Sequence, residues 1–121
     1  MPKIAVVEDN PDNRLLVRVI LEDIYEIVEY ETGQAALDDL PRANVDLVLL
    51  DISLPGMDGI EVLGCIRADE RIRDHPVIAL TAHAGPDDRD KFISAGFDDY
   101  VTKPIVDESI LLDAIARLIR K

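Results

Sequence analysis

The chain has 121 residues, 48% of them hydrophobic, which is enough for one domain with one continuous core. Its formal net charge of -12 argues against nucleic acid, because binding a phosphate backbone requires clustered Lys and Arg, and it argues equally against an anionic membrane surface. The first apolar run, residues 4–7, is too short for a signal peptide or a membrane span, and the single cysteine, Cys65, excludes an internal disulfide. We therefore expect a single cytoplasmic domain over residues 1–121 that binds neither nucleic acid nor membrane.

Short apolar runs alternate with helical patterns along the whole chain. In chain order, the runs that predict strands are residues 4–7, 26–30, 45–50, 77–80 and 100–101. The helices expected after these strands are residues 11–23, 35–40, 60–66, 86–95 and 110–119. Asn10 before Pro11 predicts the start of the first helix, Pro41 the end of the second and Gly96 the end of the fourth.

This alternation predicts the fold class. Strands that alternate with helices favour an α/β protein with a parallel sheet and right-handed crossovers. Five such units in this length match the flavodoxin-like (βα)5 architecture, a doubly wound five-stranded parallel sheet.

Acidic residues follow two of the predicted strands. Glu8 and Asp9 come directly after the first strand, and Asp51 comes directly after the third. Ligands of parallel sheets collect outside the carboxyl ends of the strands, so we expect these three side chains to converge. Three close carboxylates must either take up a proton or surround a cation, and all-oxygen ligation with remaining water positions suits Mg²⁺. A magnesium site in turn predicts a phosphoryl ligand.

Two further polar residues end later strands. Thr81 can donate a hydroxyl hydrogen bond and Lys103 supplies a positive charge, so together they could hold phosphate oxygens. If Asp51 attacks phosphorus directly, the product is an acyl phosphate on Asp51. A P-loop is excluded, because residues 59–66 have its glycine spacing without the required Lys and Ser/Thr.

At these residues the sequence resembles a response-regulator receiver domain of two-component signalling, over essentially all of its length. The likeness rests on separated motifs that occur in the order of that family. They are the pair Glu8-Asp9, residues 49–59 around Asp51, Thr81-Ala82 and Lys103-Pro104. The ordered set is far more specific than any one motif.

The resemblance implies a role for each residue of these motifs. Mg²⁺ would be bound by Asp9, Asp51 and the backbone carbonyl of Ser53, and Glu8 would act mainly through water. The phosphoryl group would contact Thr81, Ala82 and Lys103. The Lys103–Pro104 peptide bond would be cis, which the sequence supports only because X-Pro bonds have a low cis penalty.

The resemblance also implies a switch. Tyr100 would rotate inward as Thr81 moves toward a phosphoryl oxygen, which changes the face built from the last two helices and the strand between them. Alternatively, Tyr100 is a half-buried aromatic of its strand. His83 lies where the family tunes water access to the acyl phosphate, or it is simply an exposed loop residue.

The function implied is that of a single-domain response regulator, similar to the chemotaxis and cell-cycle types. It would accept a phosphoryl group from a histidine kinase or histidine phosphotransfer protein and then bind a downstream protein target. It would be a signalling protein rather than an enzyme, catalysing only its own phosphorylation and dephosphorylation. Two alternatives stay open: a Mg²⁺-dependent phosphatase, which needs a substrate cap or a second acid where Ser53 stands, and an interaction module that works without phosphorylation.

Overall fold

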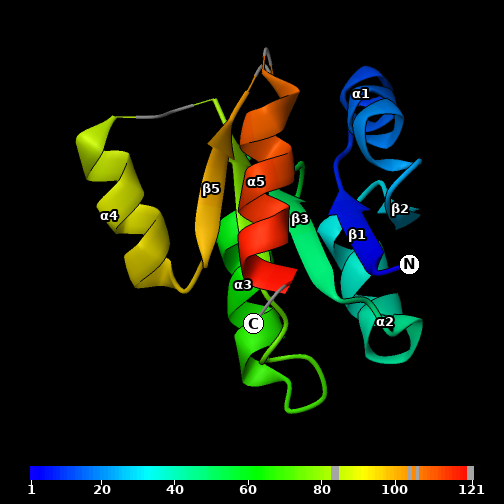
Figure 1. Ribbon diagram of the computed structural model, residues 1–121. Helices are drawn as coiled ribbons and strands as arrows, with labels where there is room; N and C mark the ends of the chain where they lie inside the picture. Colours follow the sequence, from blue (N-terminus) through cyan, green and yellow to red (C-terminus); the bar gives the residue numbers. More distant parts are fainter. Residues whose placement is uncertain (83–84, 104, 106, 120–121) are drawn as a thin grey trace.

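Five parallel strands form one sheet in the computed structural model, which describes residues 1–82, 85–103, 105 and 107–119 (Figure 1). The strands are β1 (Lys3–Val7), β2 (Glu26–Tyr30), β3 (Leu47–Asp51), β4 (Val77–Thr81) and β5 (Asp99–Thr102). The helices are α1 (Pro11–Leu21), α2 (Gly33–Ala43), α3 (Gly59–Ala68), α4 (Pro86–Ala95) and α5 (Glu108–Ile119). This alternation confirms the prediction of an α/β fold of the flavodoxin-like class.

The strand order is β2-β1-β3-β4-β5, so the chain changes direction across the sheet between β1 and β3. These two strands are paired in parallel from Ile4 opposite Leu47 to Val7 opposite Leu50. The residues that follow β1 and those that end β3 are therefore neighbours. This is the topological switch point, the usual place for a ligand in an open α/β sheet.

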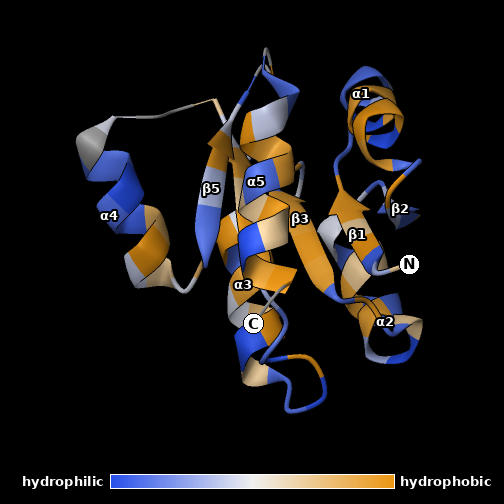
Figure 2. Cartoon of the chain, viewed as in Figure 1, coloured by the Kyte–Doolittle hydropathy of each residue, from blue (hydrophilic) through white to orange (hydrophobic). Residues whose placement is uncertain are grey.

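The two faces of the sheet bury separate apolar clusters. Alternate side chains of β1 show the division, because Ile4 and Val6 belong to one cluster and Ala5 and Val7 to the other. Helices α1 and α5 cover the first face, and α2, α3 and α4 lie on the second (Figure 1). Burial on both faces explains why β1 and β3 are mostly hydrophobic (Figure 2).

Local capping sets the helix ends that were predicted. The Asn10 side chain accepts hydrogen bonds from the backbone N–H groups of Asp12 (2.8 Å) and Asn13 (3.2 Å) at the start of α1. Gly96 ends α4 with φ of 114°, a left-handed conformation that favours glycine. Helix α1 ends at Leu21, two residues earlier than expected.

The predicted end of the second helix at Pro41 is wrong. Helix α2 continues through Pro41 to Ala43 and ends where Asn44 turns left-handed, with φ of 54°. Pro41 lies in the last turn, where its missing N–H removes one intrahelical bond, and the next turn still buries Ala43 against the core. Packing of that last turn therefore outweighs the local preference of proline.

Candidate functional site

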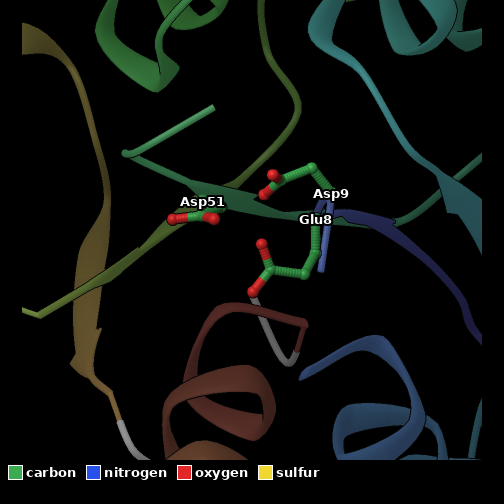
Figure 3. A group of neighbouring side chains, drawn as sticks. All are labelled: Glu8, Asp9 and Asp51. Carbon is green, nitrogen blue, oxygen red and sulfur yellow. The ribbon is translucent and has the colours of Figure 1, made fainter. Parts of the chain in front are cut away.

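Three carboxylates meet at the carboxyl ends of β1 and β3. Glu8 and Asp9 follow β1 and Asp51 is the last residue of β3, and Figure 3 shows the three side chains pointing toward one another. One carboxylate oxygen from each lies within 4.8 Å of the other two. In the part of the chain that the structure describes, this is the one group of His, Cys, Asp and Glu residues with the geometry of a metal site.

The cluster is mostly shielded from water. Glu8 is fully buried and Asp51 is 2% exposed, whereas Asp9 lies at the exposed edge. Lys103 provides a cation: its Nζ lies 3.0 Å from Asp51 Oδ1 and 3.3 Å from Glu8 Oε1. One ammonium cannot balance three ionised carboxylates, so the site keeps a net negative charge that a further cation would offset.

The pKa values of Glu8, Asp51 and Lys103 are shifted by burial and by the charges of these neighbours. Burial, reinforced by the neighbouring Asp51 carboxylate, raises the pKa of Glu8 to about 7. The pKa of Asp51 is lowered: burial would raise it, but hydrogen bonding with Glu8, Ser53 and Lys103 outweighs burial. The pKa of Lys103 is raised, because its bond to Asp51 and the charges of both acids outweigh its burial.

The donor set fits a hard divalent cation. Glu8 Oε2 is a buried oxygen without a hydrogen-bond partner among the described residues. An orphaned buried carboxylate oxygen is costly, and a cation or its bound water would satisfy it. All three side chains offer oxygen, which favours Mg²⁺ over metals that prefer nitrogen or sulfur ligands.

The loop after Asp51 is fixed by close packing against α3. Asp51 Oδ1 accepts a hydrogen bond from the Ser53 backbone N–H (3.0 Å), and Gly59 N–H donates to the Ile52 carbonyl (2.9 Å). A Cβ at Gly59 would lie 2.4 Å from the Asp51 carbonyl oxygen and 2.7 Å from Ile52 Cα. Because these are backbone atoms, only glycine allows α3 to begin at this position.

The residues expected to hold a phosphoryl group lie on the neighbouring strands. Thr81 is the buried last residue of β4, and the exposed Ala82 follows it. The Lys103 backbone N–H donates to the Thr81 carbonyl (2.7 Å), which joins the ends of β4 and β5. Tyr100 is half-buried in β5, with its ring centroid 6.1 Å from that of Phe92.

Some sequence-based expectations are not tested by this geometry. The roles of the Ser53 carbonyl, Thr81, Ala82 and Tyr100 stay predictions. His83 and Pro104 lie outside the described residues, and so does the expected cis bond.

In the described ranges, no helix is both long and apolar enough to cross a bilayer.

Sequence reasoning missed Arg14, whose guanidinium binds the backbone carbonyls of Glu8 (2.9 Å) and Asp9 (3.2 Å). A signal was present in the sequence. Arg14 is the fourth residue of α1, close to the positive end of the helix dipole, where a cation is unfavourable without a local partner.

The family model of the response regulator receiver domain matches residues 4–116. The chain belongs to this family. Among curated relatives, it is 42% identical over 113 residues to the sensor protein GacS of Pseudomonas syringae pv. syringae, covering 90% of this chain and 12% of that one. It is 39% identical over 103 residues to the polar-differentiation response regulator DivK of Brucella ovis, covering 84% of each.

Solved structures agree with this assignment. The receiver domain of sensor histidine kinase PA1611 from Pseudomonas aeruginosa PAO1, whose active-site cleft coordinates a magnesium ion, has a TM-score of 0.89 and 35% identity, over 99% of this chain and 98% of that one. Chemotaxis protein CheY4 of Vibrio cholerae has a TM-score of 0.89 and 26% identity, over 98% of each chain. The chain thus matches 84% of the length of DivK but only 12% of the length of the sensor protein GacS.

Proposed function

We propose that residues 1–121 act as one receiver domain that accepts a phosphoryl group on Asp51 from a phosphohistidine, in a Mg²⁺-dependent reaction. The donor is a histidine kinase or a histidine phosphotransfer protein. The observation that carries this proposal is the convergence of Asp51 with Glu8 and Asp9, together with Lys103 Nζ at 3.0 Å from the Asp51 carboxylate. The match to the receiver family supports it independently.

The reaction needs only positioning and charge neutralisation from the protein. A carboxylate oxygen of Asp51 forms the new O–P bond while the P–N bond of the phosphohistidine breaks, and the imidazole nitrogen leaves with the bonding electron pair. The lowered pKa of Asp51 keeps its carboxylate ionised, as a nucleophile must be. Lys103 offsets the negative charge of the phosphoryl oxygens.

A bound Mg²⁺ would be held by Asp9, Asp51 and the backbone carbonyl of Ser53, with Glu8 acting through water. Its contribution is to neutralise charge on the phosphoryl oxygens. Thr81 and Ala82 would contact the phosphoryl group together with Lys103. Thr81 ends β4 and Ala82 follows it, and β4 pairs with β3, which ends in Asp51; this position supports their role.

Phosphorylation would be read out by protein contact. Tyr100 and Thr81 would act as the switch, and the changed face would be that of α4, β5 and α5, where a downstream protein target binds. The half-buried Tyr100 ring beside Phe92 of α4 supports this, because its movement would alter the packing of that helix.

Intact mass after incubation with a small phosphodonor and Mg²⁺ tests the proposal. Wild type is expected to gain one phosphoryl adduct, Asp51→Asn none, and the exposed control Asp23→Asn the same as wild type. An undiminished adduct on Asp51→Asn would overturn the assignment of the acceptor. Steady turnover of phosphomonoesters would show a phosphatase instead, and unchanged partner affinity after phosphorylation would show an interaction module that works without it.

A further inference from the structure

We infer that Arg14 is a positioning residue for the metal site: it acts through the main chain of the acidic pair and does not itself bind metal or phosphoryl group. This inference rests on the proposed function, because it concerns how two of the proposed ligand residues are aimed. It stands on the contacts of a single guanidinium group with two consecutive peptide carbonyls.

The contacts of Arg14 join three segments. Its Nη1 donates to the carbonyl oxygens of Glu8 (2.9 Å) and Asp9 (3.2 Å), which lie in the turn between β1 and α1. Its Nη2 lies 3.4 Å from Glu31 Oε1, and its Nε lies 3.8 Å from Glu29 Oε1, both at the end of β2. The side chain is 16% exposed, and its bond to the Glu8 carbonyl is partly shielded from water.

These bonds fix the direction of the acidic side chains. The Glu8 N–H already donates to the Tyr30 carbonyl (3.0 Å), so Arg14 completes the hydrogen bonding of the Glu8 main chain. Arg14 binds the carbonyls of both peptide units that flank Asp9, and the Asn10 side chain caps the helix that follows, so the turn has little freedom to rotate. The Cα–Cβ directions of both acids follow from this backbone.

Arg14 also opposes the repulsion within the site. Three carboxylates repel one another, and the exposed Asp9 lies where the turn could most easily swing outward. A charge-assisted bond to the carbonyl of Asp9 resists that movement. Outer groups that orient metal ligands in this manner typically change metal affinity by about 10–100-fold when they are lost.

Arg18 provides a matched control. It lies one turn later on the same helix, and its guanidinium is paired with Glu29, which Arg14 also approaches. Its side chain is 47% exposed. Arg14→Gln and Arg18→Gln therefore remove the same charge from α1 and from the vicinity of Glu29, but only the first removes the bonds to the acidic pair's carbonyls.

The test is titration of metal-free protein with Mg²⁺ by calorimetry, with far-UV circular dichroism and urea unfolding as checks on folding. Arg14→Gln is expected to weaken Mg²⁺ binding at least tenfold, and Arg18→Gln by less than about twofold. Arg14→Lys should be intermediate, since an ammonium keeps the charge but loses the planar fork. Amide hydrogen exchange at residues 8–10 should accelerate in Arg14→Gln even without metal.

Two results would overturn the inference: wild-type Mg²⁺ affinity in Arg14→Gln, or equal weakening by Arg14→Gln and Arg18→Gln. If Arg14→Gln does not fold, the folded Arg14→Lys decides, because wild-type affinity there would also contradict the role. Failure of the proposed function looks different, since wild type would bind Mg²⁺ yet take no phosphoryl group. A wild type that binds no Mg²⁺ would overturn both.

Discussion

The acidic site is held by several hydrogen bonds and close contacts, whereas α4 packs against the rest of the molecule mainly at its C-terminal end. Lys103, Arg14 and Gly59 each make contacts below 3.5 Å that hold the carboxylates or their loops. Helix α4 is polar along much of its length, and Phe92 is the one buried side chain among those described in it (Figure 2).

The attachment of α4 lies at its C-terminal end. Phe92 packs edge-on against Phe97, with ring centroids 6.0 Å apart. Arg67 of α3 donates from Nε (3.2 Å) and Nη2 (2.8 Å) to the Gly96 carbonyl, and it also pairs with Asp98 (3.0 Å). A site that must hold repelling charges is built rigidly, and a helix that would transmit a signal has little buried surface to resist a shift.

The largest effect is expected from removing the positive charge of Lys103 beside Asp51. Lys103→Gln should slow phosphorylation of Asp51 by about 100-fold or more, because loss of one preorganised electrostatic contact typically costs that much. The time course of the phosphoryl adduct by intact mass measures it. The control Lys91→Gln, on the exposed surface of α4, should react as wild type does, and a similar rate in both variants would contradict the role of Lys103.

Helix α3 contains two glycines in different surroundings: Gly59 is packed closely against the Asp51 loop, and Gly64 lies on the exposed helix surface. Gly59→Ala should lower the free energy of unfolding by about 1–3 kcal/mol, because its Cβ would overlap the Asp51 carbonyl. Gly64→Ala should raise it by about 0.5–1 kcal/mol, since among the described atoms nothing lies within 4 Å of the added carbon. Urea unfolding compares the two, and an increase in the free energy of unfolding for both variants would show that the close approach at Gly59 is unimportant.

The C-terminal attachment of α4 can be loosened separately. Arg67→Ala should cost about 2 kcal/mol of unfolding free energy, because it breaks several charge-assisted bonds to carbonyls. Amide exchange should accelerate at the C-terminal end of α4 while phosphorylation by a small donor continues. Arg71→Ala, which removes an exposed pair with Asp69, should leave both unchanged.

A smaller effect concerns pH in the absence of metal. The pKa of Glu8, about 7 in the folded protein, exceeds its ordinary value of 4.5, so the folded state binds the extra proton. Its contribution to stability is complete below pH 4.5 and is lost as pH rises through 7. Urea midpoints in EDTA at pH 5.5 and 8 should differ less in Glu8→Gln than in wild type.

Mg²⁺ has the opposite dependence, because it binds the ionised site and releases the proton of Glu8. Its apparent affinity should rise by about tenfold per pH unit below 7 and level off above it. Calorimetry at several pH values measures this. A flat profile would show that Glu8 is ionised before metal binds.

The sequence was sufficient for the architecture and for the acidic residues, because hydrophobic periodicity and strand-end position are properties of neighbouring residues. It was insufficient for the contacts of Arg14 and for the end of α2. Arg14 binds carbonyls, which have no sequence identity, and the run of α2 through Pro41 depends on burial of Ala43 by distant residues. Lys103 was placed near phosphate, but its bond to Glu8 spans 95 positions and depends on the register of β1, β3, β4 and β5.

The division of the interior by the sheet has an evolutionary consequence. The cluster under α1 and α5 and the cluster under α2, α3 and α4 are separated by the strands, so substitutions in one should combine additively with substitutions in the other. Substitutions can then accumulate in one cluster independently of the other. A lineage could remodel the helices that meet one protein while the opposite half of the domain stays as inherited.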